Sequence, residues 1–305
     1  MKQRVLGSLW LIMILVMTAP AASALDEATL DFRKVTANVY VGTQSIPLYP
    51  LGLSEYPGTY ITVNFYLLAC EDKSEVVLID APVVVVNSDG DILVDLLTPF
   101  GTILENEFPG AEIKAVLLTH DHLDHISFSI MHFLQSAIPV YISEEELAAN
   151  EEEMGEFDFP VGLFYPNTLN PGDSIAFGEG QLKAIQLYGH TPGHIGYAFT
   201  DEAAGKINWL FAGDALHAPP EDYSGPTDPF DITYCFRLNV LAIDNPDLIT
   251  WIDNLETVEK QLTPKARLFP AHGAVETGIY WRAPAEYIAY TIDAIQNPDA
   301  TPCPQ

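Results

Sequence analysis

Short runs of β-branched and aromatic residues dominate the first third of the chain and predict strands. These runs cover residues 37–42, 60–70 and 75–80. Between the first two lies 46–58, a segment rich in proline, glycine, leucine and tyrosine, which we expect to form a loop. Apolar residues between Gly and Pro favour a substrate-binding lid over core packing. The apolar residues concerned are Tyr49, Leu51, Leu53 and Tyr56.

Beyond residue 90, segments with helical periodicity alternate with short apolar strands. The expected helices cover 92–107, 126–137, 244–262 and 282–296, and the expected strands cover 113–118, 139–142, 181–186, 195–199 and 267–269. Pro99 is expected to kink or split the first helix. Asn245 is expected to cap the third, with Pro246 at its first position. The order of elements indicates two β-rich layers covered by helices, in one domain.

An acidic helix is predicted directly after Ser143. Ser143 and Glu146 have the spacing of a capping box, in which each residue satisfies a backbone N–H of the first turn. The glutamates that continue through Glu153 are interpreted as a solvated helix face, because a run of charges is more often solvated than a cation site.

The first 24 residues predict a secretory signal peptide. Lys2 and Arg4 precede an almost unbroken apolar run over 5–17, and the sequence Ala-Ser-Ala at 22–24 fits a cleavage site. The run is shorter than the roughly 20 residues that a membrane-spanning helix needs. We therefore expect a periplasmic or extracellular protein, without stable membrane insertion after cleavage. Residues 25–305 are expected to form a single domain that ends in a helix.

The charge balance narrows the range of partners. The chain has 13 Lys and Arg residues against 42 Asp and Glu residues, a formal net charge of −29. Nucleic acids and anionic membranes attract basic surfaces, so neither is an expected partner. A hydrophobic fraction of 48% is sufficient for a core and argues against a disordered chain. A small neutral or apolar substrate is favoured, and the sequence does not indicate an oligomeric state.

The three cysteines do not form a disulfide framework or a zinc-binding cysteine motif. Cys70 lies in an apolar run and is predicted to be a small buried hydrophobic residue. Cys235 and Cys303 could pair in an oxidising compartment, although nothing in their spacing shows that they do.

The strongest chemical signal is the hexapeptide HDHLDH at 120–125, directly after an apolar strand. Imidazole nitrogen and carboxylate oxygen atoms are common zinc ligands in proteins. Burial of these histidines and aspartates without partners would cost free energy. The alternative to a metal site is a solvated, histidine-rich turn. We expect His120 and His122 to face one metal ion. Asp124 and His125 are then expected to face a second.

Three further segments place ligand types at the ends of expected strands. They are His190 in GHTPGH, Asp214 in FAGD and His272 in FPAHG. Loops at strand ends on a rigid scaffold are where binding sites are commonly built. The second histidine of GHTPGH, His194, is expected to support the loop rather than to bind metal.

With these motifs in this order, the chain resembles the metallo-β-lactamase superfamily over residues 37–272. The resemblance implies an α/β fold, the αββα sandwich of two mixed β-sheets flanked by helices. Asp80 in LIDAP is similar to the family's first motif, an aspartate that supports the metal-binding loop. The ligands that the resemblance implies are His120, His122 and His190 for one ion, Asp124, His125 and His272 for the other, and Asp214 between the two.

The ligand set differs from that of the true β-lactamases of this superfamily, which lack a bridging aspartate. It is similar to that of glyoxalase II, the homoserine lactone lactonases and related esterases. Glyoxalase II binds glutathione thioesters through basic residues in its later part, and the same part of this chain is poor in Lys and Arg. The lactonases often have a tyrosine three residues after the bridging aspartate. This chain has His217 there, which we take as a candidate catalytic residue beside Asp124.

The resemblance implies a secreted dinuclear hydrolase of carboxylic esters or lactones, with a lactonase as the favoured subtype. A hydroxide shared by two Zn²⁺ ions would attack the carbonyl carbon, with Asp124 at the leaving group and His217 at the developing oxyanion. Iron or manganese would suit the same ligands. The alternatives are a β-lactamase-like or thioester hydrolase, a mononuclear iron-dependent sulfur dioxygenase, and a non-catalytic sensor on the same fold.

Overall fold

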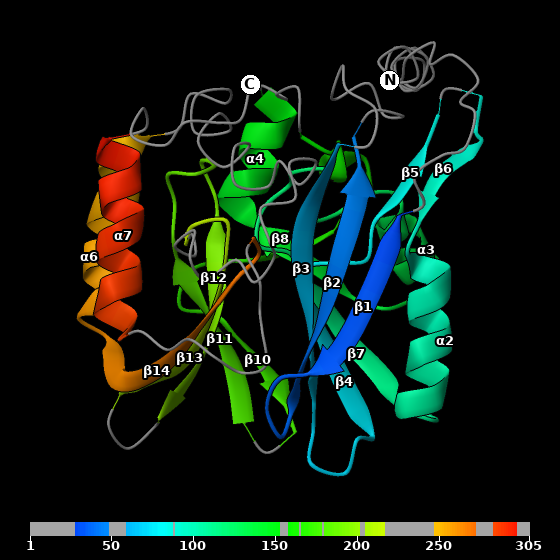
Figure 1. The fold of residues 1–305 in the computed structure, drawn as a ribbon, viewed down its shortest axis with the longest axis horizontal. Helices are drawn as coiled ribbons and strands as arrows, with labels where there is room; N and C mark the ends of the chain where they lie inside the picture. The colour runs from blue at the N-terminus through cyan, green and yellow to red at the C-terminus, as the bar shows by residue number, and fades with distance from the viewer. Residues whose placement is uncertain are drawn as a thin grey trace, which may run out of the picture.

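Two β-sheets pack face to face and carry helices on both outer sides (Figure 1). The computed structural model describes residues 28–48, 59–87, 89–152, 158–164, 166–178, 180–201, 205–216, 247–272 and 283–297. Within these ranges the first sheet has the strand order β1-β2-β3-β4-β7-β8-β9, and the second has the order β10-β11-β12-β13-β14. This is the αββα sandwich that the sequence predicts.

The first sheet is mixed, because its second half is built by parallel crossovers. β4, β7, β8 and β9 run parallel to their neighbours in that order, whereas β1 to β4 are antiparallel. A small hairpin of β5 and β6 stands beside this sheet. The strands are β1 (Thr29–Lys34), β2 (Val39–Pro47), β3 (Tyr60–Ala69), β4 (Glu75–Ile79), β5 (Val84–Val86), β6 (Ile92–Asp95), β7 (Glu112–Leu117), β8 (Val140–Ser143) and β9 (Asn167–Leu169).

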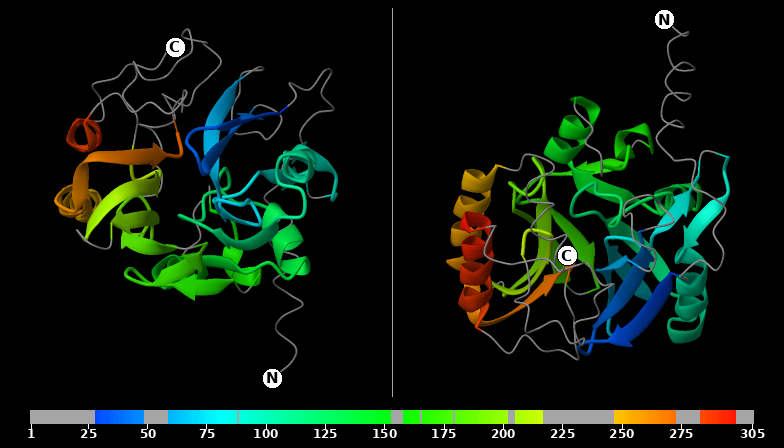
Figure 2. Two further views of the ribbon diagram at one scale, coloured as in Figure 1. Left: turned by 90° about the horizontal axis from the view of Figure 1, so that it is seen from below. Right: turned by 45° about the horizontal axis from the view of Figure 1, so that its top comes forward.

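The second sheet is antiparallel except for its last pair, β13 and β14, which run parallel. Figure 2 shows the two sheets between α6 and α7 on one side and α2 on the other. The remaining strands are β10 (Ser174–Phe177), β11 (Gly180–Gln186), β12 (Ile195–Asp201), β13 (Lys206–Gly213) and β14 (Leu262–Pro270). The helices are α2 (Leu97–Glu107), α3 (Ser129–Gln135), α4 (Glu144–Glu152), the 3₁₀ turn η2 (Val161–Phe164), α6 (Leu248–Glu259) and α7 (Pro284–Gln296).

Alternate side chains of the strands fill the layer between the two sheets. Leu68 and Ile79 from the first sheet pack in one buried cluster with Phe211 and Phe269 from the second. Two tyrosines also bond across this layer: Tyr66 donates to the carbonyl of Pro270 at 2.5 Å, and Tyr197 donates to that of Leu118 at 2.7 Å. The sheets are therefore held in register by hydrogen bonds as well as by apolar burial.

The topology brings the ends of the strands that precede the candidate ligands to one edge of the sandwich. β4 and β7 run parallel in the first sheet, as β13 and β14 do in the second, so each pair ends at the same side. The antiparallel strand β12 begins at this edge, and the loop that joins β11 to it lies there as well. Every candidate metal ligand within the described residues follows one of these strand ends.

The segment 92–107 is the clearest error of the sequence prediction. Ile92–Asp95 forms strand β6, and the helix begins only at Leu97. Pro99 lies in the first turn of that helix, where its missing N–H would have no partner inside the helix, so it neither kinks nor splits it. Asp95 accepts the backbone N–H of Thr98 at 2.9 Å and marks the helix start.

The predicted helix 244–262 is also shorter than expected. It begins at Leu248 and is capped by Asp247, whose carboxylate accepts the N–H of Thr250 at 3.0 Å. The proposed cap at Asn245 is therefore wrong, and Leu262 belongs to β14. β2 continues to Pro47, into the expected loop, while the rest of the proposed lid, 49–58, lies outside the described residues.

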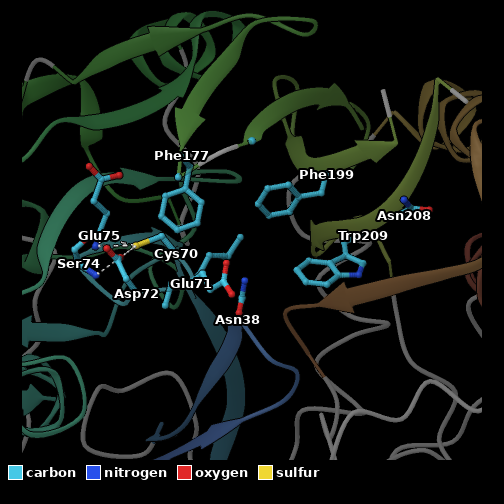
Figure 3. A pocket seen from close by; sticks show the side chains of 14 residues that line it. Asn38, Cys70, Glu71, Asp72, Ser74, Glu75, Phe177, Phe199, Asn208 and Trp209 are labelled. Carbon is cyan, nitrogen blue, oxygen red and sulfur yellow. Dashed lines mark hydrogen bonds between the residues drawn. The ribbon is translucent and has the colours of Figure 1, made fainter. Parts of the chain in front are cut away.

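Cys70 is not the buried residue that the apolar run suggested. It is half-buried in the turn after β3, and its thiol donates to a carboxylate oxygen of Asp72 at 2.9 Å. This turn borders a cavity of about 890 Å³ between the sheets, where Figure 3 shows Phe177, Phe199 and Trp209 opposite the turn. β4 begins at this end of the sandwich and ends at the edge with the candidate ligands, so the cavity is separate from them. No helix in the described ranges is both long and apolar enough to cross a bilayer.

Tyr197→Phe should lower the free energy of unfolding by about 1–3 kcal/mol, because the buried carbonyl of Leu118 then loses its hydroxyl donor. Urea unfolding would measure the loss. Tyr141→Phe is the control, since Tyr141 is half-buried in β8 and its hydroxyl makes no hydrogen bond within the described ranges. Equal losses in the two variants would show that the bond between the sheets is not what stabilises the fold.

Candidate metal centre

Two groups of ligand-type side chains meet at the shared edge of the two sheets. The first group consists of His120, His122, His190 and Asp214, and the second group of Asp124, His125 and His272. Within each group the candidate ligand atoms all lie within 4.8 Å of one another. The structure thus brings together the seven side chains that the sequence singled out. Their binding of metal stays a prediction.

The turn that follows β7 divides the HDHLDH segment between the two groups. The N–H of His125 bonds to the carbonyl of His122 at 3.1 Å, which closes a turn over 122–125. His120 and His122 therefore face the first group, while the turn brings Asp124 and His125 to the second. Ala81 N–H bonds to the carbonyl of His125 at 2.9 Å and attaches the end of the turn to the segment after β4.

A glycine allows the strand that carries Asp214 to approach the HDHLDH loop closely. Gly213 has a positive φ of 53°, which side chains rarely tolerate. A Cβ atom built there would lie 2.6 Å from the hydroxyl of Thr119 and 2.8 Å from Nε2 of His194. The glycine of FAGD is therefore a geometric requirement of the site.

The carboxylate of Asp214 lies between the two groups. Its Oδ2 is 3.5 Å from Nε2 of His190 in the first group and 3.3 Å from Nε2 of His272 in the second. Its Oδ1 is 3.2 Å from Nε2 of His125. Asp214 is only 3% exposed. One carboxylate is thus within reach of both groups, as the resemblance implies.

In the second group, the imidazole nitrogen that faces away from the centre makes a hydrogen bond that fixes the orientation of each histidine. Nδ1 of His272 donates to the carbonyl of Thr62 at 2.8 Å, so Nε2 faces the centre. Nδ1 of His125 bonds to Oδ2 of Asp80 at 3.1 Å in the same way. Oδ1 of Asp80 accepts the backbone N–H of Thr119 at 2.8 Å. The expected support of the loop by Asp80 is therefore present, and such bonds set ligand basicity and orientation.

Positive and negative side chains face one another inside the centre in the metal-free protein. Burial alone would lower the pKa of His125, but the carboxylates of Asp214 and Asp124 raise it to about 10. The pKa of His272 is raised well above its usual range against the same burial effect, chiefly by Asp214. Burial would raise the pKa of Asp214, yet His272 and His125 hold it well below its usual range. At neutral pH, His125 and His272 are imidazolium ions paired with carboxylates.

His120 and His194, in contrast, have lowered pKa values and are neutral at pH 7. Burial and the neighbouring His125 and His122 lower the pKa of His120 well below 6.5. Burial also lowers the pKa of His194 to about 3. The His194 ring stacks on that of His120 with centroids 4.8 Å apart, which supports the ligand without joining either metal group.

The arrangement fits a divalent cation. Nδ1 of His122 and Nε2 of His190 lie 3.2 Å apart, close to the separation of about 3.3 Å that tetrahedral ligands at about 2.0–2.1 Å from zinc would have. Nε2 of His120 is buried and has no hydrogen-bond partner within the described ranges. An unpaired buried nitrogen is costly unless something coordinates it. Imidazole and carboxylate also form the ligand set of iron and manganese sites.

Sequence reasoning missed two carboxyl groups behind the first group. Glu146 was assigned to a solvated helix face, but it is 1% exposed, whereas Glu144 and Glu145 beside it are exposed as expected. Asp121 of HDHLDH is also buried, and its carboxyl group accepts from the amide of Asn150 rather than joining either metal group. Burial and the adjacent carboxylate of Glu146 raise the pKa of Asp121 well above its usual range. One sequence signal could have indicated that Glu146 is buried. Ser143, Glu146 and Asn150 have the spacing of one helical face, separate from the exposed glutamates.

Other predictions concern residues that the structure does not describe. His217 is the residue after Leu216, at which the described segment ends, so its catalytic role stays a prediction. The signal peptide, Cys235 and Cys303 also lie outside the described residues, and the extent of the domain over 25–305 stays a prediction.

Comparison with known proteins places this centre in a family. The family description "Metallo-beta-lactamase superfamily" matches residues 59–273. The chain belongs to the metallo-beta-lactamase superfamily. The seven candidate ligands all lie inside the matched range.

Two curated members of similar sequence are both named hydroxyacylglutathione hydrolase. That of Bdellovibrio bacteriovorus is 33% identical over 107 residues, which is 34% of this chain and 35% of that protein. That of Bartonella quintana is 33% identical over 104 residues, which is 34% of each chain. This chain therefore matches only about a third of the length of these relatives.

Solved structures share the sandwich at lower sequence identity. The metallo-beta-lactamase FIM-1 from Pseudomonas aeruginosa, in a form with one zinc, aligns with a TM-score of 0.57 and 15% identity over 91% of this chain and 99% of that one. A beta-lactamase domain protein from Burkholderia ambifaria aligns with a TM-score of 0.52 and 18% identity over 88% of this chain and 75% of that one. These similarities support the superfamily fold alone.

Zinc uptake by the metal-free protein at pH 7.5 should release about two protons, because the imidazolium ions of His125 and His272 must lose theirs to become ligands. Affinity should therefore fall as the pH is lowered. Calorimetry in two buffers of different ionisation enthalpy would count the protons. Potassium chloride at equal ionic strength is the control. Zinc uptake without proton release would contradict the charge assignment.

Asp214→Ala should lower the metal content of both sites, because its carboxylate lies within 3.5 Å of a histidine from each group. We expect the bound metal to fall from about two ions per chain toward none. Elemental analysis after dialysis would measure it. Asp253→Ala, an exposed position in α6, serves as the control. If Asp214→Ala retains two ions as tightly as the wild-type protein, the bridging role is wrong.

Proposed function

We propose that this protein is a secreted dinuclear metal-dependent hydrolase that cleaves a carboxylic ester or lactone. The observation that carries the proposal is the position of the Asp214 carboxylate between two ligand groups, which suits two ions that share a ligand. Zinc is the favoured metal, and iron or manganese would fit the same side chains. Two such ions would act as Lewis acids and would make a shared water molecule acidic at neutral pH.

The second group is the open side of the centre, and we infer that the substrate approaches there. The side chains of Asp124 and His272 in this group are 20% and 11% exposed, whereas those of His120, His190 and Asp214 in the first group are 0%, 2% and 5% exposed. Asp124 lies 3.3 Å from Nε2 of His272, where it would relay a proton from the attacking water to the leaving group. His217 is proposed as the donor to the developing oxyanion.

The substrate class rests on charge and on the named relatives. The strongly negative chain, at −29, favours neutral or apolar acyl compounds over polyanions. The second candidate is a thioester hydrolase, because two similar sequences are named hydroxyacylglutathione hydrolase. The scarcity of basic residues, 13 in the chain, argues against an anionic glutathione conjugate. Export to the periplasm or the exterior is part of the proposal and rests on the amino-terminal signal sequence.

A substrate panel at low salt would test both the reaction and the charge preference. Neutral lactones and aryl esters should have kcat/KM values at least about tenfold higher than their carboxylated analogues, and the gap should narrow as salt screens the repulsion. Glutathione thioesters and β-lactams complete the panel. A polyanionic substrate that outran every neutral ester would contradict the charge argument.

Metal analysis of the active preparation separates the remaining alternatives. About two zinc ions per chain would support hydrolysis. A single iron per chain with oxygen consumption on a persulfide substrate would instead support a sulfur dioxygenase. A full metal complement without turnover of any panel compound would favour a non-catalytic sensor.

A further inference from the structure

A buried glutamate bonds to both loops that carry the first group. Glu146 lies in the first turn of α4, and its carboxylate is 1% exposed. A buried carboxylate is tolerated only when hydrogen bonds replace its hydration. Three donors do so here: the backbone N–H of Asp121 at 3.1 Å, the hydroxyl of Thr191 at 2.8 Å and the backbone N–H of Gly193 at 2.8 Å.

These donors belong to two segments that are far apart in the sequence. Asp121 stands between His120 and His122 in HDHLDH, whereas Thr191 directly follows His190 in GHTPGH. Oε1 accepts from the first segment and Oε2 from the second. One side chain thus spans the gap between the loops that supply three imidazoles to one metal group.

The approach of α4 to the second of these loops is a built contact. A Cβ atom on Gly193 would lie 2.0 Å from the backbone nitrogen of Glu146, so only glycine permits this distance. Ser143 accepts the N–H of Glu146 at 2.9 Å, which is one half of the predicted capping box, and donates its own hydroxyl to the carbonyl of Gly193. The carboxylate of Glu146 is directed at the loops, which is unlike an ordinary capping glutamate.

A second residue of the same helix face continues this contact. The side-chain amide of Asn150 donates to Asp121 at 2.6 Å and to the carbonyl of Phe159 at 2.9 Å. The N–H of Phe159 in turn bonds to the carbonyl of Asp121 at 2.7 Å. The backbone around Asp121 is therefore fixed from both sides, and His120 and His122 are fixed with it.

We propose that Glu146 is a positioning residue of the first metal group, which sets the separation of His120 and His122 from His190 by bonding to both loops. The proposal rests on the proposed dinuclear centre and names a residue that determines its metal affinity. Partners that orient ligands in this way typically contribute 10- to 100-fold to metal affinity.

The test measures zinc affinity one group at a time, by competition with a chromophoric chelator. His272→Ala disables the second group, so zinc bound by this variant reports on the first group. Adding Glu146→Gln should weaken that binding by about 10- to 100-fold, because the amide offers one acceptor oxygen where the carboxylate offers two. Glu145→Gln in the same background is the matched control, since Glu145 is exposed in the same helical turn.

The reciprocal background separates positioning from general destabilisation. His190→Ala disables the first group and leaves the second group, which Glu146 contacts only through the N–H of Asp121, three residues before Asp124. Glu146→Gln should weaken zinc binding in this background much less than in the His272→Ala background. Equal losses in the two backgrounds would overturn the proposal, because they would indicate a global effect on the fold.

Thr191→Val gives a milder variant in case Glu146→Gln folds poorly. It removes one of the three donors and should weaken zinc binding in the His272→Ala background by several-fold, less than Glu146→Gln. The effects of the two substitutions should not add, because Thr191→Val removes a donor to the same carboxylate that Glu146→Gln replaces. Additive effects would overturn the proposal.

The outcomes also separate this proposal from the proposed function. If the His272→Ala protein binds no zinc, the proposed centre itself fails, and the role of Glu146 fails with it. If that protein binds zinc but Glu146→Gln and Thr191→Val leave the affinity unchanged, the centre stands and only the positioning role is overturned.

Discussion

The burial of one carboxylate, Asp214, among imidazoles is the constraint on which the rest of the site depends. Asp214 is 3% exposed and has Nε2 atoms of four histidines within 3.8 Å. A buried carboxylate must be neutralised, either by imidazolium ions or by metal cations. In the metal-free protein, His125 and His272 provide that charge, as their raised pKa values indicate. The same side chains are the candidate metal ligands, so a cation that binds there would replace the imidazolium protons as the neutralising charge.

The sandwich provides the rigidity that such a site needs. Side chains that must stay within a few ångströms of one another come from both sheets, so the position of one sheet against the other sets the geometry. Tyr66 and Tyr197 donate hydrogen bonds across the layer, to Pro270 and to Leu118, both within two residues of a candidate ligand. The bonds that join the sheets are thus also bonds that place His120 and His272.

The sequence predicts well which ligand-type side chains come together, because their signal is local. HDHLDH, GHTPGH and FAGD are short motifs at strand ends, and chemistry alone suffices to mark them. The supporting residues were harder to predict, because their roles depend on distant contacts. Glu146 reads as one of several glutamates on an acidic helix, and only tertiary packing against Thr191 and Gly193 shows that it differs from Glu145.

The difference between local signals and distant contacts also explains the errors in the predicted fold. Ile92–Asp95 has an apolar pattern that a helix and a strand can both satisfy, and its pairing with Val84–Val86 decides for the strand. Strands β1 and β9 are short edge strands. Their strand conformation depends on pairing with β2 and β8 rather than on their own composition. Long-range pairing is the information that a pattern along the chain does not contain.

The two metal groups differ in how firmly the protein holds them, and the difference follows from which elements stand behind each. The first group lies against α4 and the loop fixed by Glu146, with His120 fully buried. In the second group, Asp124 and His272 are partly exposed, at 20% and 11%. Exposure lets water and substrate reach that side, and it also weakens the electrostatic interactions that hold an ion there. The first group is therefore the closed side of the centre, and the greater exposure of the second group agrees with the proposed approach of a substrate from that side.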